Sequence, residues 1–213
     1  MKIAPGFYAA AAIWLIAAAP GLSGAAEPAS PRTVPVAEAE TPAKLESIEV
    51  GATRPAHRFG RFHLAGQPAP EDLPKWKALG VRTVINLRMP NETDWDERAA
   101  VEGFGMKYIS IPFAGPDTLT NEKIKKSLTA LRTGHLSDQS KKGASDEKKS
   151  KPKPVLLHCS TSNRVGAIWY AHRILHDDAD ADAALEEAKR AGLRTMGYLE
   201  PVDKYIEQAR ADE

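Results

Sequence analysis

His158-Cys159-Ser160-Thr161-Ser162-Asn163-Arg164-Val165-Gly166 is the stretch around which the rest of this chain is interpreted. The segment just before it, Pro154 to Leu157, is short and apolar and predicts a buried strand. The residues just after it, 167–175, are rich in apolar side chains and predict a helix. We therefore expect Cys159 to lie where a strand turns into the N-terminus of a helix.

A strand-to-helix turn of this kind can bind an anion, because its backbone N–H groups point inward and the helix dipole lies behind them. We expect the amides of residues 160–164 to form such a cradle. Arg164 adds a guanidinium fork that suits a tetrahedral oxyanion. The same positive field favours the thiolate form of Cys159. The stretch predicts a nucleophile within an anion-binding loop, in preference to the small buried hydrophobe that a lone cysteine often is.

The loop resembles the active-site loop of the cysteine phosphatase superfamily, the protein tyrosine and dual-specificity phosphatases. Those loops have five residues between Cys and Arg, whereas this one has four, Ser160, Thr161, Ser162 and Asn163. Four is the spacing of the rhodanese sulfurtransferases and of the phosphatase-like domain of beta-lactamase-hydrolase-like proteins. The similarity to that last group extends to residues 65–68, 81–88 and 191–193 and covers about residues 58 to 210. It implies a protein tyrosine phosphatase-like fold.

The first 26 residues have the pattern of a bacterial secretory signal peptide. Lys2 supplies a positive charge, an apolar run extends from Phe7 to Ala19, and Gly24 to Ala26 are small residues that suit cleavage. The run is shorter than the ~20 residues that a membrane span needs, so an uncleaved anchor is the less favoured alternative. We expect a periplasmic or secreted protein that has no membrane contact after cleavage.

Composition divides the rest of the chain into three parts. Residues 27–55 are rich in Pro, Ala, Glu and Thr and predict a flexible linker. Residues 56–213 are expected to form the phosphatase-like catalytic domain, interrupted by a lysine-rich, disordered insertion at 134–153. With 29 Lys and Arg against 28 Asp and Glu, the chain has no net basic field that would recruit nucleic acid.

Strands and helices alternate along the predicted domain. Strands are expected at 61–64, 81–87, 106–113 and 154–157, and helices at 70–79, 94–103, 120–132, 167–175, 180–190 and 200–209. The alternation predicts an α/β fold, with a mostly parallel central sheet and helices on both faces. Ligands of such folds bind at the carboxyl ends of the strands, where both Cys159 and Asp117 are expected.

Asp117 is the candidate general acid, because it follows a strand as the acid does in the phosphatases that the chain resembles. Pro-Asp is also a common turn pair, so a structural role for Asp117 stays open. His158 is expected to order the loop through a buried hydrogen bond. Gln67 and Arg88 follow strand ends and either line the crevice or serve loop structure. No metal or cofactor is expected.

Three functions are compatible with this loop, each with a small anionic substrate or a phosphorylated molecule as partner. The favoured one is a cysteine phosphatase that cleaves a phosphate ester. The alternative is a sulfurtransferase carrying a persulfide on Cys159, and a third is a non-catalytic anion-binding module. Two residues depart from the phosphatase pattern: Val165 stands where many of these enzymes have Ser or Thr, and Ser162 replaces an expected Gly. If the backbone needs a positive φ there, Ser162 adds strain.

Overall fold

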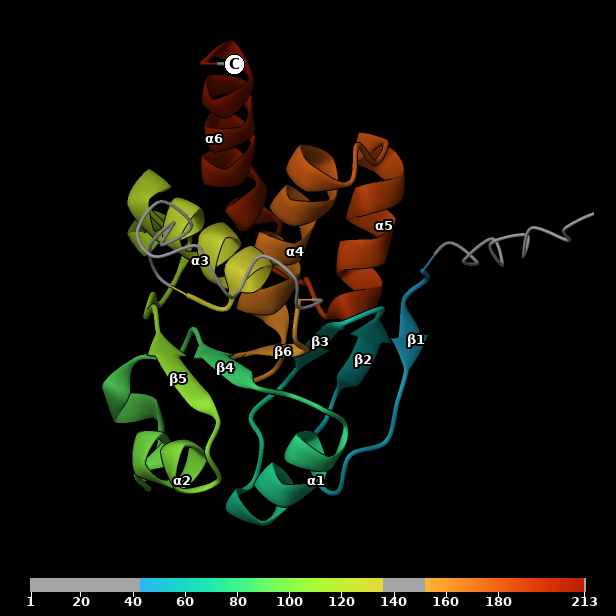
Figure 1. The fold of residues 1–213 in the computed structure, drawn as a ribbon. Coiled ribbons are helices and arrows are strands. Elements are labelled where there is room, and N and C mark those ends of the chain that lie inside the picture. The colour runs from blue at the N-terminus through green and yellow to red at the C-terminus, as the bar shows by residue number, and fades with distance from the viewer. Residues whose placement is uncertain (1–42, 136–151, 213) are drawn as a thin grey trace, which may run out of the picture. The chain divides into compact units, whose positions relative to one another are not determined.

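The computed structural model describes residues 43–135 and 152–212 (Figure 1). The predicted signal peptide at 1–26, the first part of the predicted linker and most of the predicted insertion at 134–153 lie outside these residues. The strands are β1 (Glu46–Ser47), β2 (Ala56–Phe59), β3 (Phe62–Ala65), β4 (Thr83–Asn86), β5 (Lys107–Ser110) and β6 (Val155–His158). The helices are α1 (Leu73–Ala78), α2 (Glu97–Gly103), α3 (Asn121–Thr133), α4 (Asn163–His176), α5 (Ala181–Ala191) and α6 (Leu199–Ala211).

The strands form one sheet in the order β1-β2-β3-β6-β4-β5. Strands β3, β6, β4 and β5 run parallel, and β1 and β2 are added antiparallel at one edge. Strand β6, which leads into the cysteine loop, is central: Leu157 lies opposite Leu64 of β3 and Ile85 of β4. Its four residues are all buried, as expected for a parallel strand covered on both faces. The predicted mostly parallel sheet is confirmed.

Helices cover both faces of the sheet, as predicted (Figure 1). Helices α1 and α2 lie on one face and α3 to α6 on the other. Because side chains alternate along a strand, Leu156 packs into the core under α1 and α2, whereas Leu157 packs into the core under the remaining helices. Helix α4 is apolar on most sides because it is enclosed between the sheet and α3, α5 and α6.

The N-terminal boundary of the domain was predicted too late. The compact unit that contains the sheet begins at Thr41, and β1 pairs with β2 inside the range assigned to the linker. The buried carboxylate of Asp72 accepts hydrogen bonds from the amides of Ala52 and Thr53 and from the Thr53 hydroxyl, all at 2.9 Å. Residues 43–55 are held by these polar contacts, by the edge strand and by Val50, which is buried in the core with Ile48 packed against it, a combination that produces little apolar periodicity.

The helix predicted at 94–103 also begins later than expected. Residues Pro90–Glu92 form a short 3-10 turn (η2), and Thr93 to Trp95 precede the helix. Asp96 is the N-cap of α2, where its carboxylate accepts a hydrogen bond from the Ala99 amide at 2.9 Å. Glu92 therefore lies in the turn before α2, and Glu97 is the first residue of α2. Both residues contact side chains of the candidate site.

Candidate active site

The cysteine loop joins the carboxyl end of β6 to the N-terminus of α4. Cys159 directly follows β6 and is 1% exposed, while Ser160 and Thr161 are exposed to solvent. Ser162 is the residue before α4 and has φ of 65° and ψ of 5°, in the left-handed region. The strand-to-helix turn therefore places the nucleophile candidate at the position that the sequence predicts, and Ser162 occupies a backbone conformation that favours glycine.

Backbone amides around this turn are free to receive an anion. Within residues 43–135 and 152–212, the amides of Ser160, Thr161 and Ser162 donate to no other group. The amide of Gly166 bonds to the Ser162 carbonyl at 2.9 Å, so the first amides of α4 precede the helical hydrogen-bond ladder. The helix is 14 residues long, so its dipole adds a favourable field for negative charge at this end.

The guanidinium of Arg164 is held from one side. Its Nη1 donates to the carbonyls of Leu87 and Phe113 at 3.2 and 2.8 Å and to Glu92 Oε1 at 2.7 Å. Its Nη2 donates to Glu92 Oε2 at 2.6 Å. Burial lowers the pKa of Arg164, but its hydrogen bonds to Glu92 and its interactions with Cys159 outweigh burial, so the pKa is raised. The guanidinium also interacts with Cys159, and its hydrogens that are not bound to Glu92 or to the two carbonyls are the donors available for a ligand.

Glu92 is a site residue that the sequence analysis did not find. Its pKa is lowered, chiefly by the hydrogen bond from Arg164, so it is a carboxylate at neutral pH. A second cation, Arg88, lies on the same carboxylate, with 3.7 Å between Arg88 Nε and Glu92 Oε2. No sequence signal identifies Glu92, because it is one acid in a surface turn 72 residues from its partner.

A segment after α5 clamps the cysteine loop from outside. Asn163 Oδ1 accepts hydrogen bonds from the amides of Arg194 and Thr195 at 2.7 and 3.0 Å, and Arg194 Nη2 donates to the Thr161 carbonyl at 2.8 Å. The side chain of Asn163 is therefore occupied by structural contacts, and its backbone amide is the group that is predicted to bind an anion.

Gly192 allows the same segment to approach the loop closely. A Cβ at this position would lie 2.7 Å from the Ser162 Cβ and 3.0 Å from the Ser162 carbonyl oxygen. Its φ of 126° is also a conformation that side chains rarely adopt. The region 191–193, noted for its resemblance to phosphatase-like domains, thus packs directly against the cysteine loop.

His158 lies under the loop and is fully buried. Its Nε2 is 3.2 Å from Glu97 Oε1. Burial first, and then the positive charges of Arg88 and Arg164, lower the pKa of His158 to about 3, so the imidazole is neutral at physiological pH. A neutral imidazole here leaves Arg164 as the cation that faces the cysteine.

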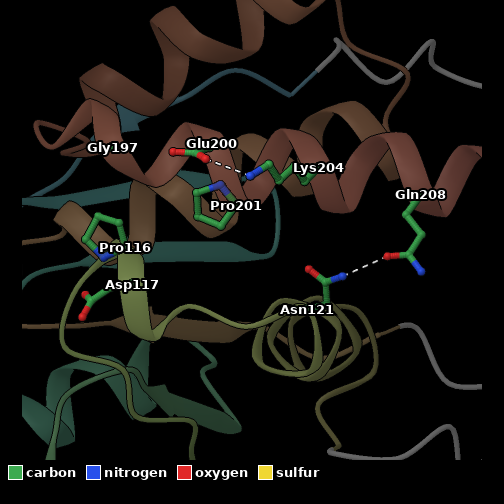
Figure 2. Close-up of a pocket in the computed structure, with 8 residues that line it drawn as sticks. All are labelled: Pro116, Asp117, Asn121, Gly197, Glu200, Pro201, Lys204 and Gln208. Carbon is green, nitrogen blue, oxygen red and sulfur yellow. Dashed lines mark hydrogen bonds and ion pairs between the residues drawn. The ribbon is translucent and has the colours of Figure 1, made fainter.

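Asp117 lies in the short turn η3 (Pro116–Thr118), after the strand β5, and its residue is exposed. It stands at the edge of a pocket of about 540 Å³ between this turn and α6, with its carboxylate directed away from Glu200 and Lys204 (Figure 2). The phenol of Tyr198, a buried residue, contacts the loop before this turn through the Ala114 carbonyl. Burial is the largest cause of the raised pKa of Tyr198, and the charges of Arg164, Cys159 and Asp117 all act on it.

Tyr198 was also missed by the sequence analysis. It belongs to the turn η6 (Met196–Tyr198) before α6, and its hydroxyl donates to the Ala114 carbonyl at 3.3 Å. Its ring packs edge-on against Phe113, whose carbonyl binds Arg164. Tyr198 therefore lies between the strand end that holds Arg164 and the loop that carries Asp117.

Two further properties concern the described residues alone. In the ranges 43–135 and 152–212, no group of three or more His, Cys, Asp or Glu side chains is arranged to hold a metal ion. Among the helices described, none combines the length and the apolar character that a membrane crossing requires.

The fold is that of the protein tyrosine phosphatase-like proteins, and the sequence of the chain is similar to that of a dual specificity protein phosphatase. It is 26% identical over 189 residues to the dual specificity protein phosphatase TpbA of Pseudomonas aeruginosa (strain UCBPP-PA14), a match that covers 88% of this chain and 73% of TpbA.

Solved structures agree on the fold. The P. aeruginosa TpbA structure in complex with pTyr superimposes with a TM-score of 0.55 at 20% identity, covering 78% of this chain and 90% of that one. A mutant form of Tk-PTP gives a TM-score of 0.55 at 19% identity, covering 78% and 97%. No family model matches the chain.

Proposed function

We propose that this protein is a cysteine-dependent phosphatase that hydrolyses phosphate monoesters through Cys159, Arg164 and Asp117. The observation that carries the proposal is the pairing of Cys159 and Arg164 across the loop between β6 and α4. Arg164 is held by Glu92 and two carbonyls and interacts with Cys159, so its guanidinium is oriented beside the loop amides. A phosphoryl group has three equatorial oxygens, and this arrangement offers donors for all of them.

In the proposed reaction, the sulfur of Cys159 attacks phosphorus in line with the ester oxygen. The P–S bond forms as the P–O bond breaks, and the carboxylic acid of Asp117 gives its proton to the leaving oxygen. Water then attacks the thiophosphate, the P–S bond breaks, and the Asp117 carboxylate takes the water proton. Arg164 and the amides of residues 160–164 stabilise the charge on the equatorial oxygens in both steps.

The proposed substrate is a phosphorylated molecule, and TpbA with bound pTyr supports an aryl phosphate as the first substrate to test. The signal-like N-terminus supports export to the periplasm as the place of action. The similarity to TpbA supports a phosphatase over the sulfurtransferase that the four-residue spacing also allows.

Purified protein and its Cys159→Ser variant should be assayed with an aryl phosphate and, separately, mass-analysed after mixing with thiosulfate. The proposal requires ester turnover that disappears in Cys159→Ser while the variant keeps its fold. Absence of turnover together with a stable gain of one sulfur on Cys159 would replace the phosphatase by a sulfurtransferase.

A further inference from the structure

A group of buried polar side chains lies behind the cysteine loop, and the proposed reaction does not use it. Its centre is the carboxyl group of Glu97, a residue that is 3% exposed. Glu97 Oε1 accepts a hydrogen bond from Gln67 Nε2 at 2.8 Å and is the oxygen that lies close to His158 Nε2. Glu97 Oε2 accepts from Asn86 Nδ2 at 2.7 Å and from the Tyr108 hydroxyl at 3.2 Å.

This group is connected to Arg164 by a chain of side chains. The Gln67 amide that donates to Glu97 accepts, through its oxygen, a hydrogen bond from Arg88 Nη1. Arg88 in turn lies on the Glu92 carboxylate that binds Arg164 in two places. The contacts therefore lead from Arg164 back to Glu97, and from Glu97 to the imidazole of His158.

The topology explains why this chain encloses the loop. Gln67 follows β3 and Arg88 follows β4, and these are the two strands that flank β6. The Arg88–Gln67 contact therefore crosses the end of β6, where Cys159 begins. The backbone N–H of Gln67 also donates to the Ser160 carbonyl at 3.1 Å, which connects Gln67 to the backbone of the cysteine loop.

A carboxyl group suits this position because its neighbours are donors. Gln67, Asn86 and Tyr108 all direct a hydrogen at Glu97, and an ionised carboxylate offers acceptor sites to all of them. Burial raises the pKa of Glu97, and the hydrogen bonds from Gln67 and Tyr108 oppose that rise. If glutamine replaced Glu97, its side-chain NH₂ group would face an N–H donor of Gln67 or Asn86. One buried donor would then be left without an acceptor.

We propose that Glu97 is a positioning residue for the chemistry of the cysteine loop. Its carboxyl group fixes the Gln67 side chain, which holds Arg88 and, through Glu92, the guanidinium of Arg164. On its other side the carboxyl group lies 3.2 Å from Nε2 of His158, the residue directly before Cys159. This inference rests on the proposed function, because positioning matters only if Cys159 and Arg164 act together on an anion.

The test compares Glu97→Gln with Glu187→Gln as a matched control. Glu187 is 7% exposed and accepts hydrogen bonds from Trp169 Nε1 at 2.7 Å and Arg173 Nε at 2.8 Å, so it is similarly buried and bonded but packs along α4, beyond the loop. The readouts are the rate at which iodoacetamide alkylates Cys159, the inorganic phosphate concentration that halves this rate, and kcat with an aryl phosphate.

Glu97→Gln should raise the protecting phosphate concentration about 10-fold or more, and lower kcat by a similar factor, because small misplacement of reacting groups is costly. Glu187→Gln should leave both values at the wild-type level, whatever its effect on Tm. Equal phosphate protection in wild type and Glu97→Gln would overturn the inference, as would equal losses in the two variants.

A rescue experiment separates positioning from a general loss of stability. Adding Gln67→Glu to Glu97→Gln exchanges donor and acceptor across the contact and still offers a carboxylate to Arg88. The double variant should recover phosphate protection to within about threefold of wild type, since the donor–acceptor pairing is restored. A double variant no better than Glu97→Gln would contradict the positioning role. If wild-type Cys159 is not protected by phosphate at all, the proposed function fails first and this inference with it.

Discussion

The guanidinium of Arg164 and the carboxylate of Glu92 form a two-point ion pair although 72 residues separate them along the chain, with N–O distances of 2.7 and 2.6 Å. The planar fork of arginine matches a carboxylate in this way, and the pair fixes the rotation of the guanidinium. Nη1 is also bound by the carbonyls of Leu87 and Phe113, and the guanidinium interacts with Cys159, so we expect substrate oxygens to meet its remaining hydrogens.

Glu92→Gln should weaken catalysis, because the guanidinium of Arg164 would no longer be fixed in one rotational position. We expect kcat/KM for an aryl phosphate to fall by about 10- to 100-fold, as is typical when a substrate-binding group is misplaced. Glu102→Gln, which removes the exposed carboxylate paired with Arg98, is the control and should have no effect. Tighter phosphate binding by Glu92→Gln would show instead that Glu92 competes with the substrate for Arg164.

Asp117→Asn tests the general acid. An ester leaves as an alkoxide or phenoxide, and a general acid contributes about 10²–10⁴ in rate, most for poor leaving groups. We therefore expect alkyl phosphates to lose more turnover than aryl phosphates carrying electron-withdrawing groups. Unchanged turnover of alkyl phosphates, with Arg164→Lys still inactive, would place the acid on another residue.

Ser162→Gly should stabilise the protein. The left-handed backbone at Ser162 costs a residue with a side chain about 1–2 kcal/mol, and glycine gives back about 0.5–1 kcal/mol through its freer unfolded chain. The buried Ser162 hydroxyl also has no hydrogen-bond partner among the described residues, so its removal leaves nothing unsatisfied. Urea unfolding should show a gain of about 1 kcal/mol. A loss of stability would mean that the hydroxyl is used.

Gly192→Ala should destabilise the protein and disturb the cysteine loop, because the new Cβ would meet both the side chain and the carbonyl of Ser162. Ser162→Gly removes the first of these clashes and keeps the second. The two substitutions together should therefore be less damaging than the sum of their separate effects. Strict additivity in urea unfolding would show that the segment moves away from the loop instead.

Acid should destabilise the fold through its buried histidines. Burial, as the largest cause, lowers the pKa of His63 to about 4, of His158 to about 3 and of His172 to about 4. Below the unfolded value of 6.5 the unfolded chain binds these protons and the folded chain does not, so the free energy of unfolding falls as pH falls from 6.5 towards 4. The pKa of Glu97 is raised instead, so protonation of Glu97 weakly opposes this fall in the free energy of unfolding near the lower end of the pH range.

The slope should be about 1.4 kcal/mol per pH unit for each histidine that gains a proton. Urea unfolding at several pH values measures it, and His63→Gln should remove about one histidine's share. A free energy of unfolding that is flat between pH 6.5 and 4 would mean that these imidazoles are already protonated in the folded protein.

Local patterns in the sequence determined the fold class and the position of Cys159, the candidate nucleophile. An apolar β6 followed by the polar loop and the apolar α4 required a strand-to-helix turn at Cys159, whatever the rest of the chain did. The left-handed backbone of Ser162 could also be predicted from the sequence, because the resemblance of the contiguous loop places a glycine at this position. The edge strand β1 and its neighbour β2 escaped prediction because short, half-exposed strands have little periodicity.

Only the tertiary structure decided which residues support Cys159 and Arg164. Glu92 and Tyr198 reach the loop from turns distant in sequence, and Glu97 appeared to be an ordinary acid in the first turn of a helix. Their partners depend on the order of β3, β6 and β4, which brings three strand ends to one edge of the sheet. Hydrogen bonds over such separations leave no periodic trace in the sequence, because they depend on the positions of single side chains.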